Sequence, residues 1–195
     1  MKQFAKTLCL FFVAVLMFGL TACNDNSNNN DNIHNIAFED GETMQMQLKT
    51  KDGFQVMGIS DRVHTATDMW EEFWRYELQF RDHYTEPFYQ IAVYERFGDD
   101  DLRHLTIGAE YLGNRPDNID LTVVDVPAAM WAVFTIQGPV HETRWDIYAR
   151  VNDEWGATWF EEYGFARDEN APYLEIFPGS EYWELWIPVN VFAGQ

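Results

Sequence analysis

The chain is poor in cysteine and in basic residues. Only Cys9 and Cys23 occur among 195 residues, and 13 Lys and Arg stand against 32 Asp and Glu, a formal net charge of -19 at pH 7. So large an acidic excess argues against nucleic acid as a partner and disfavours an anionic ligand. Because no cysteine follows Cys23, residues 24–195 contain no disulfide, thiol nucleophile or cysteine metal site.

Recurrent catalytic and metal-binding motifs are also missing. No G-x-S-x-G, P-loop or dinucleotide fingerprint occurs. The histidines His64, His83, His104 and His141 are scattered and lack a second ligand three or four residues away on one helix, apart from common acids such as Asp68. We therefore expect neither a metal nor a cofactor.

No apolar run is long enough to span a bilayer as a stable helix. The run Leu8–Leu20 has 13 residues, whereas about 20 are needed. Lys2 and Lys6 precede it and Leu20-Thr21-Ala22-Cys23 closes it, which is typical of an export signal. Leu-Thr-Ala-Cys resembles the bacterial lipoprotein lipobox. That resemblance implies a signal peptide at residues 1–22 and lipid such as palmitate on Cys23. The protein would then be anchored by lipid in the bacterial cell envelope, and the resemblance does not specify which membrane leaflet. The alternative is an ordinary secretory signal.

Beyond the signal, composition divides the chain in two. Residues 23–44 are rich in Asn and lack periodicity at their start, which predicts a flexible tether. Residues 45–192 are long enough for one domain, with halves of about 45–118 and 119–192. In the first half we predict a strand at 47–60, a helix at 67–84 and strands at 88–97 and 102–112. The second half repeats this order with strands at 120–124 and 130–137, a helix at 142–155 and a final hairpin.

The hairpin, residues 173–189, is the most informative stretch. A Pro178-Gly179-Ser180-Glu181 turn predicts that Tyr173 lies opposite Trp186, Glu175 opposite Glu184 and Phe177 opposite Tyr182. One face would then be aliphatic. The other would carry carboxylates among aromatic rings, which suits a flat apolar or cationic ligand.

PYLEIF and YWELWIPV in this hairpin resemble the C-terminal hairpin of the GyrI-like (AraC-type) effector-binding domain family of multidrug-sensing regulators. DVPAAMWAVFTIQGPV, TRWDIYARVNDEW and GATWFEEYGF fit the same pattern. The resemblance implies an α+β fold: two pseudo-symmetric βαββ units forming a curved antiparallel sheet, with a helix from each unit and a cleft between them.

The resemblance also implies a site. Glu175 matches the acid with which drug-binding members of the family bind a cation. A second carboxylate, Glu184, would lie opposite it. We expect the aromatic walls to come from Tyr173, Phe177, Trp186, Trp131 and Trp145. For each of these rings, packing in the core is the alternative.

These patterns predict a membrane-anchored protein that binds a small hydrophobic aromatic or cationic molecule. Signal and tether occupy the place of the DNA-binding helices of related regulators, so we expect no nucleic acid partner, and a protein partner stays open. We expect binding rather than catalysis. The alternative is a GyrI-like hydrolase of reactive genotoxic compounds, with Glu175 as base and Tyr173 or Tyr182 as proton donor. A third hypothesis is an envelope domain whose cleft is closed by its own side chains.

Overall fold

The computed structural model describes residues 33–37, 43–63, 67–80, 83, 89–97, 103–111, 113–117, 119–138, 143, 147, 163–179 and 181–191. Cys23, Trp145 and nearly all of the predicted helix at 142–155 lie outside these residues. Within them, no helix is both long and apolar enough to cross a membrane.

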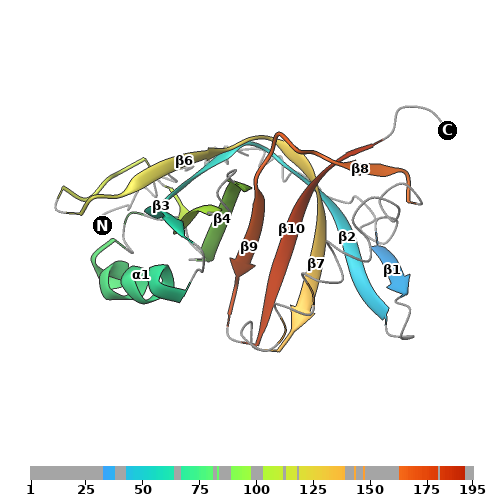
Figure 1. Ribbon diagram of the computed structural model, residues 1–195, viewed down its shortest axis with the longest axis horizontal. Helices are drawn as coiled ribbons and strands as arrows, with labels where there is room; N and C mark the ends of the chain where they lie inside the picture. Colours follow the sequence, from blue (N-terminus) through green and yellow to red (C-terminus); the bar gives the residue numbers. More distant parts are fainter. Residues whose placement is uncertain are drawn as a thin grey trace, which may run out of the picture.

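The described part of the chain is mostly antiparallel sheet with one helix. In chain order its elements are β1 (Ile33–Ala37), β2 (Thr43–Lys51), β3 (Phe54–Val63), α1 (Thr67–Phe80), β4 (Gln90–Phe97), β5 (Arg103–Glu110), β6 (Thr122–Val126), β7 (Ala129–Gln137), β8 (Phe165–Arg167), β9 (Tyr173–Phe177) and β10 (Tyr182–Val191). The strands lie in the order β1-β2-β7-β10-β9-β4-β5-β3-β6, and β8 pairs with β10. Figure 1 shows that they form one curved sheet.

Two pairs of consecutive strands in this sheet are each joined by a bend of two residues. The chain passes from β2 into β3 at Asp52–Gly53, and from β6 into β7 at Pro127–Ala128. β2 pairs with β7 and β3 pairs with β6, so the two bends face each other. A Cβ on Gly53 would lie 3.2 Å from the Ala128 nitrogen and 3.3 Å from the Val126 oxygen. Glycine therefore lets the two bends approach closely.

Helix α1 covers one face of the sheet, beside β3 and β5 (Figure 1). Met69 and Phe73, four residues apart, are buried against the sheet, whereas Glu71 and Glu72 are exposed. This is the 3.6-residue periodicity from which the helix was predicted, and the prediction is confirmed with an end at Phe80. Trp74, one residue after Phe73, is 55 % exposed, so it is not part of the buried stripe of the helix.

Buried side chains form one cluster on each face of the sheet. The face that α1 covers, here called the helix face, carries Met57, Leu105, Phe134 and Trp183 among others. The opposite face, here called the far face, carries a second cluster of Val56, Ile91, Val93, Val126, Trp131, Val133, Leu174, Ile176 and Trp186. Both faces of the central strands are therefore apolar, so alternation along one strand does not say which face is inside.

Three expectations need correction in detail. The single strand predicted at 47–60 is two strands, β2 and β3, because the chain bends at Gly53. Ile33–Ala37, within the predicted tether, form β1 and pair with β2 from Ile33↔Gln47 to Ala37↔Thr43. His34, which we took for a tether residue, makes an edge contact with Tyr163 at 5.5 Å between ring centroids. The composition of this segment hid a short edge strand.

Candidate functional site

The register of the β9–β10 hairpin differs by one residue from the predicted one. Leu174 pairs with Trp186, Glu175 with Leu185 and Ile176 with Glu184. Because side chains alternate between the two faces, a shift of one residue exchanges the faces of one strand relative to the other. Glu184 and Trp186 thus lie on the far face, whereas Glu175 lies on the helix face, and the predicted register is wrong.

Neighbouring strands explain this register. β10 also pairs with β7, where Trp183↔Ile136 and Leu185↔Phe134 place both apolar β10 residues on the helix face. β9 also pairs with β4, where Tyr173 lies opposite Tyr94 and Glu175 opposite Ala92. Tyr94 and Ala92 belong to the helix-face cluster. Burial on both sides of the hairpin therefore outweighs the turn as the determinant of register.

Glu175 is a fully buried carboxylate. Its side chain has 0 % exposure, and its Oε2 accepts a hydrogen bond of 2.9 Å from the hydroxyl of Tyr94. The Tyr94 ring stacks on Tyr173 at 4.7 Å with an interplanar angle of 4°. Glu175 lines neither of the two cavities described below. Tyr182 lies on the far face, so it is not placed to serve Glu175 as a proton donor.

The structure separates the aromatic side chains that we predicted as walls. Tyr173 and Phe177 lie with Glu175 on the helix face, where Phe177 meets Trp70 edge-on at 5.0 Å between ring centroids. Trp131 and Trp186 lie on the far face and contact each other at 5.9 Å. Trp131 is buried, and within the described residues its Nε1 has no hydrogen-bond partner. Trp145 is outside the described residues.

An open cavity of about 290 Å³ lies on the far face. We call it the aromatic cavity. Its walls come from six strands or their ends: Lys49, Lys51, Phe54, Tyr89, Ile91, Glu110, Ile176, Pro178, Tyr182, Glu184 and Trp186. Apolar walls with a few charged groups are typical of small-molecule sites. Of the predicted ligand-binding residues, only Trp186 lines it.

Glu184 is held from two sides in this cavity. Its Oε2 accepts a hydrogen bond of 2.7 Å from the indole Nε1 of Trp186, and its Oε1 lies 3.4 Å from the Nζ of Lys49. The same Nζ lies 5.2 Å from the centroid of the Trp186 ring. The carboxylate is therefore oriented by two donors, and the Lys49 ammonium lies close to both this carboxylate and an aromatic ring.

Lys51 repeats this arrangement at the other side of the cavity. Its Nζ lies 3.2 Å from Glu110 Oε2 and 4.4 Å from the centroid of the Phe54 ring. The two arrangements differ in burial: Glu184 is 16 % exposed and Glu110 35 %. Less solvent screening at Glu184 makes it the stronger of the two cation positions.

Sequence reasoning named Glu184 only as a neighbour of Glu175, and did not select Lys49, Lys51 or Glu110. Part of the signal was present, because Glu184-x-Trp186 and Lys49-x-Lys51 each place two side chains on one face of a strand. What brings the pairs together is β7, which separates β2 from β10 and pairs with both. That long-range pairing has no local signature.

Several solved structures share this fold. The C-terminal domain of EcmrR superposes with a TM-score of 0.55 at 16% identity, covering 76% of this chain and 98% of that one. SAV2435, solved bound to tetraphenylphosphonium, has a TM-score of 0.54 at 17% identity and coverages of 75% and 94%. The Vibrio cholerae integron cassette protein VCH_CASS2 has a TM-score of 0.53 at 16% identity and coverages of 74% and 95%. No curated protein sequence matches the chain.

A match to a family of sequences gives the class of this domain. The sequence profile described as "GyrI-like small molecule binding domain" matches residues 44–190. The chain belongs to the GyrI-like family, as the hairpin and the upstream motifs predicted.

Proposed function

We propose that this domain binds a small aromatic cation in the aromatic cavity, with Glu184 as its counterion and Trp186 as its stacking surface. The observation that carries this proposal is the position of Lys49. Its ammonium group, 3.4 Å from Glu184 and 5.2 Å from the Trp186 ring, occupies the environment that a cationic ligand needs. The Lys49 ammonium therefore lies where we expect the positive group of the ligand to bind.

The energetics favour exchange of this lysine for a ligand. Lys49 is 33 % exposed, and a pair screened to this extent contributes only about 0–1 kcal/mol. A ligand cation over the ring gains about 0.5–2 kcal/mol and adds the burial of its own apolar surface. Lys49 can then turn to solvent on its flexible stem.

Charge and size narrow the ligand class. The net charge of -19 attracts cations over longer distances. A cavity of about 290 Å³ lies at the small end of ligand sites. The cavity therefore has room for one or two aromatic rings, and the remaining part of a larger ligand would extend into solvent. SAV2435, a structural neighbour, was solved with the aromatic cation tetraphenylphosphonium, which supports the same ligand class here.

The test compares two ions of one shape and opposite charge. Tetraphenylphosphonium and tetraphenylborate are titrated into the protein while tryptophan fluorescence and heat of binding are followed. We expect saturable binding of the phosphonium only. Glu184→Gln keeps the shape and removes the charge, and it should weaken phosphonium binding at least about tenfold, equivalent to about 1.4 kcal/mol.

Two variants serve as controls. Glu181→Gln removes a charge from the exposed hairpin turn and should leave affinity unchanged. Glu175→Gln removes the buried carboxylate of the helix face and separates our two candidate acids. Equal binding of both ions, or a loss of binding with Glu175→Gln but not with Glu184→Gln, would contradict the proposal.

The proposal extends to two features supported by sequence. One is the lipid anchor on Cys23 after an export signal at residues 1–22, which would place the cavity in the cell envelope. The other is a pair of matching units. The hairpins β4–β5 and β9–β10 support it, because their first strands pair with each other near the middle of the strand order. A second helix at 142–155 would complete the second unit.

A further inference from the structure

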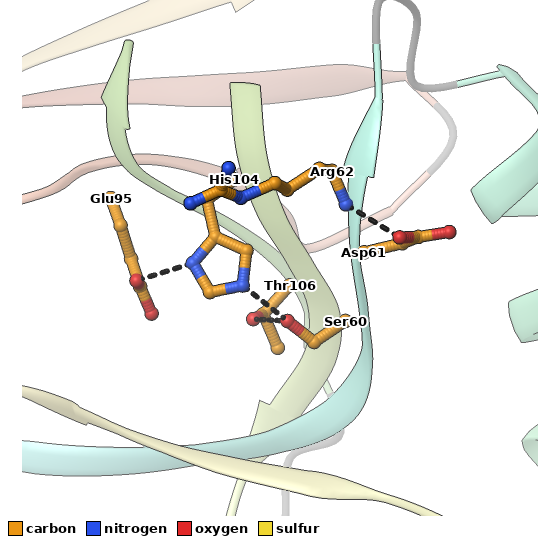
Figure 2. A network of polar contacts seen from close by, with 6 residues as sticks. All are labelled: Ser60, Asp61, Arg62, Glu95, His104 and Thr106. Atoms are coloured by element: carbon orange, nitrogen blue, oxygen red, sulfur yellow. Dashed lines mark hydrogen bonds and ion pairs between the residues drawn. The ribbon is translucent and has the colours of Figure 1, made fainter. Parts of the chain in front are cut away.

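A second group of polar side chains lies on the far face, away from the aromatic cavity. Ser60 on β3, His104 and Thr106 on β5, and Glu95 on β4 form a chain of hydrogen bonds across three adjacent strands (Figure 2). Ser60 and Thr106 are cross-strand partners. Glu95 lies where the β4–β5 register shifts, between Tyr94 and Phe97. Such bulges redirect side chains and are frequent beside active sites.

An acid, an imidazole and a hydroxyl are linked one after the other by hydrogen bonds. Glu95 Oε2 lies 2.6 Å from His104 Nδ1, and His104 Nε2 lies 3.2 Å from Ser60 Oγ. Thr106 Oγ1 donates a hydrogen bond of 3.0 Å to Ser60 Oγ. Since Ser60 accepts from Thr106, its own proton is available for His104 Nε2. For Ser60 to donate to His104 Nε2, that nitrogen must be unprotonated. The neutral imidazole then carries its proton on Nδ1 and donates it in the hydrogen bond to Glu95.

We propose that Ser60, His104 and Glu95 form a nucleophile–base–acid site that hydrolyses small carboxylic esters. A base within hydrogen-bond reach of a hydroxyl, and itself oriented by a carboxylate, is the geometry that activates serine. The site uses other residues than the aromatic cavity and the buried Glu175. It is a second activity of this domain, independent of cation binding.

The reaction balances within these residues and water. Ser60 Oγ bonds to the ester carbonyl carbon while His104 Nε2 takes its proton. The tetrahedral adduct then breaks its bond to the alcohol oxygen, which receives that proton from His104. Water attacks the acyl-serine in the same way, with His104 again as base, and the acid leaves as Ser60 regains its proton. Glu95 stabilises the imidazolium in both halves.

Arg62 is the cation nearest in register to this chain of side chains. It is the cross-strand partner of His104 and lies two residues after Ser60, so it shares their face. Figure 2 shows its side chain running from β3 toward His104. From there the guanidinium can oppose the negative charge that develops on the carbonyl oxygen.

The adjoining cavity indicates which esters fit. Glu95 is also part of the wall of a second cavity of about 290 Å³, together with Val124, Asp125, Pro127, Glu169, Asn170 and Pro172. Three of these seven residues are acids. Such a cavity favours an ester that carries a positive group over its neutral isostere. The substrate class is therefore a small ester with a cationic alcohol, of the choline type.

Covalent labelling tests the nucleophile directly. The full-length protein is treated with a fluorophosphonate probe, and the modified residue is located by mass spectrometry. We expect one adduct per chain, on Ser60, and none in Ser60→Ala. His104→Gln should lower the labelling rate at least about 100-fold. Thr135→Ala, at an exposed hydroxyl on β7, is the matched control and should label like the wild type.

Turnover tests the substrate class. Hydrolysis of acetylcholine is compared with that of 3,3-dimethylbutyl acetate, its uncharged carbon analogue. We expect kcat/KM to favour acetylcholine at least about fivefold, and Glu169→Gln to reduce only that preference. Thr106→Val, which keeps the shape, should slow both esters because it removes the donor to Ser60. Labelling at another residue, or equal turnover by wild type and a folded Ser60→Ala variant, overturns the proposal.

Discussion

Glu175 and Glu184 lie on adjacent strands of one hairpin but on opposite faces of the sheet. Glu175 pairs with Leu185 and is buried on the helix face, whereas Glu184 pairs with Ile176 and borders the aromatic cavity. The two carboxylates therefore have different environments despite their proximity. Glu175 accepts a hydrogen bond from the hydroxyl of Tyr94 within the core, and Glu184 forms an ion pair with Lys49 beside an open cavity.

The Tyr94–Glu175 hydrogen bond should contribute to stability. Tyr94→Phe removes only the hydroxyl and takes one donor from a carboxylate with 0 % exposure. We expect the free energy of unfolding to fall by about 1–3 kcal/mol, measured by urea denaturation. Tyr89→Phe is the control, because Tyr89 is 41 % exposed and should tolerate the change. Equal stability of both variants would show that the Tyr94 hydroxyl is not needed to satisfy Glu175.

The glycine pair Gly58 and Gly108 should not accept a side chain. They are cross-strand partners on β3 and β5, and a Cβ on Gly108 would overlap the carbonyl oxygen of Met57. Because that obstacle is backbone, Gly108→Ala should destabilise the protein by about 1–3 kcal/mol or more. Gly179→Ala in the hairpin turn meets nothing within 4 Å and should be neutral. Thermal unfolding of the two variants measures the difference, and a stable Gly108→Ala protein would contradict it.

Removal of the internal cation should strengthen binding of an external one. Lys49→Gln frees Glu184 from its lysine, and we expect tetraphenylphosphonium to bind up to about fivefold more tightly, since such a pair contributes about 0–1 kcal/mol. Calorimetric titration gives the affinity. Arg115→Gln, which removes an exposed cation elsewhere, should change it little. In a Glu184→Gln background the effect of Lys49→Gln should vanish. If it persists there, the lysine does not compete at Glu184.

Lipid attachment should depend on one of the two cysteines. If Cys23 carries the proposed lipid, Cys23→Ala should release the protein from the membrane fraction of a bacterial host, because several buried acyl chains at about 0.8 kcal/mol per CH2 would provide the anchor. Cys9→Ala, within the predicted signal peptide, should leave the protein on the membrane. Cell fractionation followed by immunoblotting distinguishes the two. A Cys23→Ala protein that stays in the membrane fraction would show another mode of attachment.

Local patterns were sufficient for much of the fold. The spacing of Met69 and Phe73 predicted α1, and alternation with flanking turns predicted the strands that became β4, β5, β7, β9 and β10. These elements can be predicted locally, because the spacing of apolar residues within each segment determines whether it forms a helix or a strand. The bend at Gly53 was missed, since the reason for a glycine there is the approach of Ala128, seventy-five positions away.

The site required information that no local pattern contains. In this hairpin both alternating sets of residues are apolar enough to be buried, so the turn alone did not fix which set faces which cluster. The pairing of β9 with β4 and of β10 with β7 decides the matter. Family resemblance and alternation both favoured the Glu175 face, whereas the aromatic cavity, lined by described residues, lies on the face of Glu184.

A structure of the protein with tetraphenylphosphonium tests the central claim most directly. Our account predicts the phosphonium in the aromatic cavity, with a phenyl group stacked against Trp186, its charge near Glu184, and the Lys49 ammonium displaced from that carboxylate. A phosphonium bound instead within the helix-face core beside Glu175 and Tyr173, with Lys49 still 3.4 Å from Glu184, would contradict it.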